Sequence, residues 1–143
     1  MKQLALFILL TLTAFISQAS AQNLEVDSLG YETFQMPEGD TIYTMKKYFI
    51  AFLKEGPTRD QTEEEAQKIQ MGHLDHINMM ANDNKICMAG PFGDDGDIRG
   101  ILIFNVPTME EVQALVALDP AVISGRLELE VHSWWAAKGS QLK

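Results

Sequence analysis

The chain has 143 residues, of which 46% are hydrophobic and 22% charged, with a formal net charge of -9 and one cysteine. This composition is typical of one globular domain and excludes a disordered or large multidomain protein. A single cysteine excludes an internal disulfide, and 20 acidic against 11 basic residues argue against a nucleic-acid or anionic-membrane partner.

The first 21 residues have the organisation of a secretory signal. Lys2 precedes an apolar run from Leu4 to Ile16, and a cleavage box, Ala19-Ser20-Ala21, follows. The run is shorter than the roughly 20 apolar residues that a membrane-spanning helix needs. We therefore expect an exported protein, periplasmic or secreted, with no membrane association after cleavage. A buried N-terminal helix is the alternative.

Residues 22–43 show no sustained hydrophobic period and contain Gly30, Pro37 and Gly39. This pattern predicts a partly ordered N-terminal leader. We expect the folded domain over residues 44–137, followed by a C-terminal tail over residues 138–143.

The domain shows a regular succession of strands and helices. Strands are expected over residues 47–53, 85–91, 98–106 and 127–135. Two helices begin at the capping boxes Thr62–Glu65 and Thr108–Glu111 and reach about residues 82 and 118. A short helical turn begins at Asp119-Pro120 and ends at Gly125. The order βαββαβ predicts an α+β, ferredoxin-like fold with both helices on one face of an antiparallel sheet.

The other face of that sheet predicts a partner. Residues 48–53 and 101–104 are apolar on both sides of their strands, although the helices cover only one side. An exposed apolar face of this size marks an interaction surface. We therefore expect a homodimer packed sheet to sheet.

His73 is the strongest candidate for a functional side chain. On a helical wheel of about 100° per residue it lies near the middle of the apolar arc. His76 lies at the arc's edge, where it is poorly placed for an interior role, and His132 faces away from the helices. A buried imidazole needs hydrogen-bond partners, and a carboxylate would fix its tautomer. Asp119 is the expected partner, because its segment can fold back over the first helix. The alternatives are a structural core histidine and, for Asp119, a helix cap.

Other chemical motifs are weak. The run Asp94–Asp97 has too few spaced oxygen ligands for a calcium loop and favours a solvated turn. No phosphate loop, nucleophile elbow, metalloprotease motif or zinc-type spacing occurs in the sequence. Cys87 is expected to be a small buried hydrophobe. We expect no metal and no cofactor.

Four segments, in this order, resemble the YCII-related domain family. They are His73-Leu74-Asp75-His76-Ile77, Lys85–Pro91, Leu118–Gly125 and Val131–Trp134. The resemblance runs from about Lys46 to Trp135. It implies a dimer related in shape to the dimeric α/β-barrel proteins, with a pocket near His73 and Asp119.

Four further residues are expected to line that pocket: Gln70, Gly90, Pro91 and Trp134. The family often has an arginine at the position of Gln70, so an anionic group would be held differently here or not at all. For Gly90 and Pro91 the alternative is an ordinary strand end. For Trp134 it is packing in the dimer.

Two functions from different classes fit these residues. In the first, His73, oriented by Asp119, is the general acid or base of a small enzyme that isomerises a carbonyl or aromatic compound or eliminates a group from it. In the second, the protein is a non-catalytic periplasmic ligand-binding or accessory module, which the missing arginine supports. The sequence does not specify the small-molecule ligand.

Overall fold

The structure is a computed structural model that describes residues 23–142. The predicted signal sequence, residues 1–21, lies outside the described residues. The elements are β1 (Glu25–Val26), β2 (Glu32–Glu38), β3 (Thr41–Glu55), α1 (Glu63–Asn82), β4 (Ile86–Pro91), β5 (Ile98–Phe104), α2 (Met109–Val116), α3 (Pro120–Ile123) and β6 (Leu127–Ala137). No helix in this part of the chain is long and apolar enough to cross a membrane.

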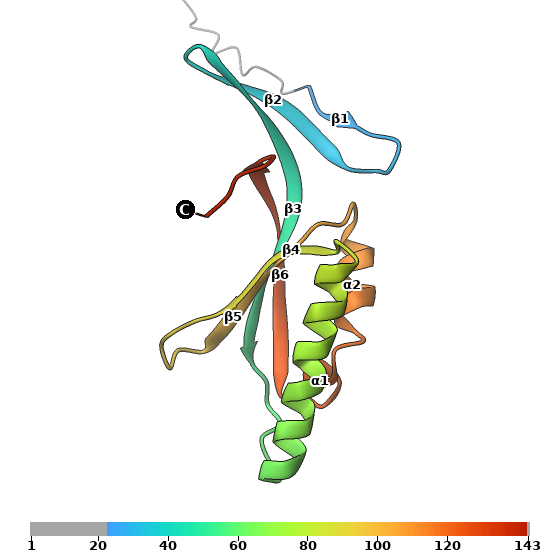
Figure 1. Ribbon diagram of the computed structural model, residues 1–143, viewed down its shortest axis with the longest axis vertical. Coiled ribbons are helices and arrows are strands. Elements are labelled where there is room, and N and C mark those ends of the chain that lie inside the picture. The colour runs from blue at the N-terminus through green and yellow to red at the C-terminus, as the bar shows by residue number, and fades with distance from the viewer. Residues whose placement is uncertain (1–22, 143) are drawn as a thin grey trace, which may run out of the picture.

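Strands β3 to β6 form the antiparallel sheet of a ferredoxin-like fold, and α1 and α2 lie against one face of it (Figure 1). The central strand is β3, which pairs with β6 along one edge and with β5 along the other, while β4 pairs with β5. The chain order β3-α1-β4-β5-α2-β6 is the predicted βαββαβ order. The predicted fold class is therefore confirmed.

The hydrophobic core lies between the sheet and the helices. Alternate residues of β3 face the helices, as the two-residue period of a strand requires. The buried apolar side chains include Phe49, Ala51 and Leu53 of β3, Leu102 and Phe104 of β5, Met80 of α1 and Val112 of α2. Burying apolar surface stabilises a protein by roughly 25 cal/mol per Å². The packing of these side chains therefore holds both helices against one face of the sheet.

The opposite face of the sheet carries half-buried and exposed apolar side chains. Tyr48, Ile50 and Phe52 alternate with the core residues of β3, and Trp134 of β6 is 40% exposed. The rings of Tyr48 and Trp134 pack together, with 6.3 Å between their centroids. The apolar face is present as predicted. A second copy of the chain packed on it stays a prediction.

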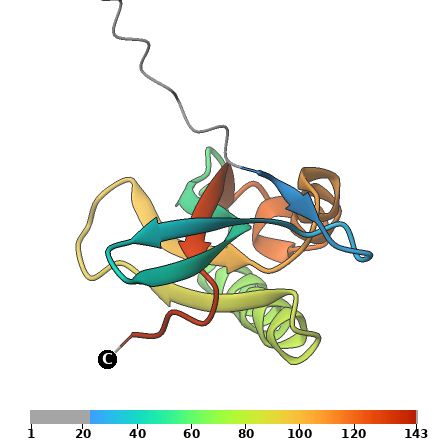
Figure 2. The ribbon, with the colours of Figure 1, turned by 90° about the horizontal axis from the view of Figure 1, so that it is seen from above.

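Residues 23–43, predicted as a leader, form strands. β2 pairs antiparallel with the first part of β3, and β1 pairs with β2. Because β3 begins at Thr41 to make this pairing, it is 15 residues long. Seen from above, this hairpin lies across one end of the domain (Figure 2). Phe34 anchors it by packing edge-on against Trp135, with 4.9 Å between the ring centroids. Because only Phe34 is buried in β2, no alternating pattern marks this strand in the sequence.

The other predicted elements are present with shifted ends. Thr62 forms a complete capping box with Glu65 at the start of α1, and α2 ends at Val116 instead of about Leu118. The prediction that Cys87 is buried is wrong. The pairing of β4 with β5 shifts register between Ile86 and Met88, so Cys87 lies at an irregularity and is exposed.

Candidate functional site

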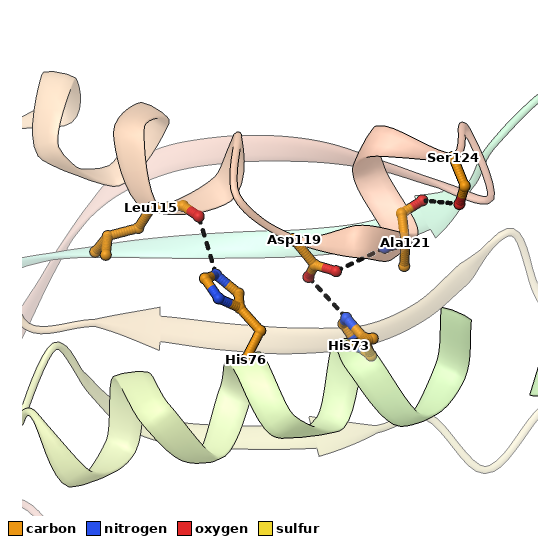
Figure 3. Close-up of polar contacts among 6 residues, drawn as sticks. All are labelled: His73, His76, Leu115, Asp119, Ala121 and Ser124. Carbon is orange, nitrogen blue, oxygen red and sulfur yellow. Dashed lines mark hydrogen bonds and ion pairs between the residues drawn. The ribbon is translucent and has the colours of Figure 1, made fainter. Parts of the chain in front are cut away.

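His73 and Asp119 form a buried pair between α1 and the start of α3 (Figure 3). The ring Nδ1 of His73 lies 2.7 Å from Oδ2 of Asp119, and the two residues are 6% and 2% exposed. The second carboxylate oxygen, Oδ1, accepts the backbone N–H of Ala121 at 2.8 Å and so caps α3. Asp119 is thus both a helix cap, through Oδ1, and the partner of His73, through Oδ2.

Gly72 allows α3 to approach α1 closely enough for this pair to form. A Cβ atom at position 72 would lie 3.0 Å from Cγ of Pro120. Pro120 is the first residue of α3, where the fixed φ of proline suits a helix. The sequence signal was an isolated glycine inside a helical pattern, to which sequence reasoning assigned no role.

His76 is buried as well, which corrects the prediction that it is poorly placed for an interior role. It is 8% exposed, and its Nε2 donates a hydrogen bond to the carbonyl oxygen of Leu115 at 2.9 Å (Figure 3). The helical wheel gave only the position of His76 relative to the apolar arc of α1. It could not show that the end of α2 packs over the edge of that arc and buries His76. His76 therefore joins α1 to α2.

The contacts of His73 define which ring nitrogen is available for chemistry. The Asp119 carboxylate only accepts hydrogen bonds, so Nδ1 carries the proton and Nε2 carries the lone pair. Nε2 has no hydrogen-bond partner in the described chain. Every fully buried side-chain nitrogen or oxygen of the described chain does have a partner. Nε2 is therefore not fully buried, and the residue that carries it lines a cavity.

That cavity has a volume of about 610 Å³ and lies between α1 and the sheet. Small-molecule sites commonly have about 300–1,000 Å³. Three of the residues predicted to line a pocket, Gln70, Gly90 and Pro91, border it. Trp134 does not, because strand alternation places it on the opposite face of the sheet, against Tyr48.

The cavity also has charged groups that sequence reasoning missed. Glu55 and the three residues Arg59, Arg99 and Arg126 border it. Arg99 forms an ion pair with Glu55, and Nε of Arg59 lies 3.5 Å from Oε1 of Glu55. The hydrogen bond from Arg99, together with the charge of Arg59, holds the pKa of Glu55 below its usual value. The only sequence signal was the position of Glu55, Arg99 and Arg126 at or beside strand ends, and Arg59, between β3 and α1, had none.

Within residues 23–142 no cluster of three or more His, Cys, Asp or Glu side chains is arranged to hold a metal ion. Residues 94–97 form the exposed turn between β4 and β5, in which the N–H of Gly96 donates to Oδ1 of Asp94 at 3.3 Å. The solvated turn expected for this run is confirmed.

The fold and the site define a class of protein: a small α+β protein with a ligand-sized cavity beside a buried histidine–carboxylate pair. The model of the YCII-related domain matches residues 49–135, and the chain belongs to this family. The resemblance predicted from the four segments is thus confirmed.

Two known proteins are similar to parts of the chain. The uncharacterized protein YjpA of Bacillus subtilis (strain 168) is 28% identical over 74 residues, which are 52% of this chain and 85% of YjpA. The 5-chloro-2-hydroxyhydroquinone dehydrochlorinase (TftG) from Burkholderia phenoliruptrix AC1100, solved in complex with 2,5-dihydroxybenzoquinone, has 24% sequence identity and a TM-score of 0.46, covering 61% of this chain and 92% of TftG. At this level of similarity no chemistry transfers from that enzyme to this chain.

Proposed function

We propose that the protein is a small, cofactor-independent enzyme in which His73 moves a proton on a carbonyl or aromatic compound, giving isomerisation or elimination. One arrangement carries this proposal: buried Asp119 holds the imidazole of His73 at Nδ1, 2.7 Å away, while Nε2 is not fully buried and His73 borders the cavity. A base fixed in one tautomer at the wall of a ligand-sized cavity is the arrangement that general acid–base catalysis requires.

The same contact supports both directions of proton transfer. When Nε2 removes a proton from a substrate carbon or hydroxyl, the imidazole becomes positively charged. The Asp119 carboxylate lies against that charge in a nearly water-free position and stabilises it. Return of the proton to a different substrate atom gives isomerisation, and departure of a group from the neighbouring carbon gives elimination.

A proton-exchange assay tests this proposal without knowledge of the natural substrate. Small ketones, lactones and hydroxylated quinones are incubated with the protein in D₂O, and loss of the exchangeable C–H signal is followed by ¹H NMR. We expect the wild type to accelerate exchange for at least one compound and His73→Gln to lose about 10²-fold or more of that rate.

The chain offers a matched control in His132→Gln. His132 also pairs with a carboxylate, its Nε2 lying 2.8 Å from Oε1 of Glu130, but it is exposed on the other face of the sheet. This variant should keep the wild-type rate. Equal exchange by His73→Gln and the wild type would refute the proposal.

The second candidate is a non-catalytic ligand-binding or accessory module. It is favoured by Gln70, a neutral side chain that borders the cavity at a position where the family resemblance implies an arginine. A compound that stabilises the wild type and His73→Gln equally, with no exchange by either, would support the module. For both candidates we propose export, on the evidence of residues 1–21, and a homodimer.

A further inference from the structure

All the arginines of this acidic chain border one cavity. The sequence contains 20 acidic residues and only three arginines, Arg59, Arg99 and Arg126, and each of the three lines the cavity beside His73. In the described part of the chain no lysine lines it. Arginine differs from lysine in presenting a planar fork of N–H donors that matches a carboxylate.

The ends of three strands position Arg99 and Arg126, while Arg59 lies in the connection between β3 and α1. β3 ends at Glu55, whose N–H donates to the carbonyl oxygen of Asp97 at 3.0 Å. The N–H of the next residue, Gly56, donates to the carbonyl oxygen of Arg126 at 2.9 Å. Arg99 in β5 and Arg126 before β6 therefore lie on opposite sides of Glu55. Their positions come from the backbone of the sheet and do not depend on a flexible loop.

The backbone around Arg126 is closely fitted. Gly125 has φ +70°, a conformation that favours glycine, and a Cβ atom on Gly56 would lie 2.2 Å from the carbonyl oxygen of Gly125. This close approach fixes where the chain leaves α3 and where the side chain of Arg126 begins.

The charges around the arginines do not cancel. Glu55 is the one acidic side chain among the cavity-lining residues of the described chain. Asp95 and Asp97 add to the effect of Glu55 in raising the pKa of Arg99, but neither lines the cavity. Among the described residues Arg126 forms no ion pair; its Nη1 donates to the neutral amide oxygen of Gln61 at 2.8 Å. The residues that border the cavity thus carry three positive charges and one negative charge.

Most of the remaining wall is apolar. Ile69 and Ile77 of α1 and Leu102 of β5 border the cavity around His73. A ligand that matches both regions has an apolar body, which these side chains cover, and an anionic group that a guanidinium can hold with two parallel hydrogen bonds.

We propose that the cavity selects small organic carboxylates, with the carboxylate bound by Arg126 and Arg99 and the apolar body placed against His73. This inference names the substrate class of the proposed function and rests on it only for the chemistry at His73. Arg126 is the principal anion ligand, because it forms no ion pair in the described chain, whereas Arg59 and Arg99 both pair with Glu55.

Calorimetric titration of the purified protein tests the proposal with matched pairs of probes. These are benzoate, phenylacetate and cinnamate, each beside its neutral amide, with inorganic phosphate as an anion that lacks an apolar body. We expect at least one carboxylate to bind about tenfold more tightly than its amide and more tightly than phosphate, as charge-assisted bidentate bonding implies. No carboxylate preference in any pair, or tighter binding of phosphate, would overturn the proposal.

Variants then locate the anion site. Arg126→Gln should weaken carboxylate binding about tenfold and leave amide binding unchanged, and Arg126→Lys should restore only part of the loss because it keeps the charge but not the fork. Lys54→Gln is the matched control, because it removes one positive charge from the residue next to Glu55 in the sequence. Lys54 points to the other face of the sheet, where its Nζ lies 3.1 Å from Oε2 of Glu130. If circular dichroism shows that Arg126→Gln is unfolded, Arg99→Gln takes its place.

The result is separable from the catalytic proposal. Carboxylate binding that depends on Arg126 in a protein without proton exchange would sustain the anion site and refute catalysis by His73. Exchange that depends on His73 but shows no preference for carboxylates over amides would sustain catalysis and refute the anion site. Equal weakening by Lys54→Gln and Arg126→Gln would attribute the effect to net charge and also overturn the anion site.

Discussion

Replacing Asp119 by asparagine separates its two structural tasks. The side chain of asparagine retains an oxygen that can accept the N–H of Ala121, as Oδ1 does now at 2.8 Å. At the position of Oδ2 it places an NH₂ group, which donates. The imidazole of His73 can keep a hydrogen bond to this group only if Nδ1 becomes the acceptor and the proton moves to Nε2.

The magnitudes differ sharply between Asp119→Asn and Asp119→Ala. The alanine variant loses the cap, worth about 1 kcal/mol, and leaves a buried ring nitrogen without a partner, which costs about 1–3 kcal/mol. Because the pair is 6% and 2% exposed, solvent screens little of this loss. We therefore expect Asp119→Ala to lower the free energy of unfolding by about 2–4 kcal/mol and Asp119→Asn by less than about 1 kcal/mol.

Urea unfolding measures these free energies, and ¹⁵N–¹H correlation spectra of the histidine rings measure the tautomer. The spectra are recorded at pH 9. The wild-type spectrum should show the His73 proton on Nδ1, and that of Asp119→Asn should show it on Nε2. Proton exchange by Asp119→Asn should fall about 10²–10⁴-fold, because Nε2 no longer presents a lone pair to the cavity.

Either of two results would refute this reasoning. The first is an Asp119→Ala protein as stable as the wild type, which would mean that the buried hydrogen bonds contribute nothing. The second is an Asp119→Asn protein that keeps both the proton on Nδ1 and the wild-type exchange rate, which would mean that the carboxylate does not orient the base.

Three further predictions concern other parts of the molecule. Gly72→Val should lower the free energy of unfolding by about 1–3 kcal/mol in urea titrations, because its side chain overlaps Pro120; unchanged stability would contradict the tight packing. Glu55 has a lowered pKa in the folded protein, so its contribution to stability is present above pH 4.5, the ordinary pKa of a glutamate, and is lost as the pH falls through the folded-state pKa. Below pH 4.5 the melting temperature of Glu55→Gln should therefore fall less steeply with pH than that of the wild type. Sedimentation at micromolar concentration should show a dimer that Trp134→Glu converts to monomer, and a monomeric wild type would exclude packing through the open sheet face.

The fold was predictable from sequence because its signals are local. The capping boxes at Thr62 and Thr108 and the apolar period of α1 involve residues a few positions apart. The orientation of His73 follows from the same helical period. β2 escaped prediction because a strand held by backbone hydrogen bonds and one buried residue, Phe34, has no period to detect.

The rest of the site depends on contacts between distant residues. His76 is buried because the end of α2 covers it, which no wheel of α1 alone can show. The charged part of the cavity exists only once the ends of β3, β5 and β6 meet, since Arg59 and Arg126 are far apart in the sequence. Trp134 was wrongly assigned to the pocket although it shares the two-residue period of His132, and the pairing of β6 with β3 places both on the other face.

The segment from Asp119 to Arg126 links the two halves of the proposed mechanism. Asp119 caps α3, a helix of four residues, and Arg126 follows the glycine that ends it, with the N–H of Arg126 donating to the carbonyl oxygen of Ala121 at 3.0 Å. The residue that orients the base and the principal anion ligand are thus carried by one short segment, which docks on α1 where Pro120 meets Gly72.

This linkage distinguishes three perturbations. Asp119→Asn should impair proton transfer and spare carboxylate binding, whereas Arg126→Gln should weaken carboxylate binding and leave the tautomer of His73 unchanged. Gly72→Val displaces α3 as a unit and should therefore impair both, with the tautomer of His73 and the carboxylate affinity changing together. If Gly72→Val changed only one of the two, the segment would not move as one body, and the orienting carboxylate and the anion ligand would be positioned independently.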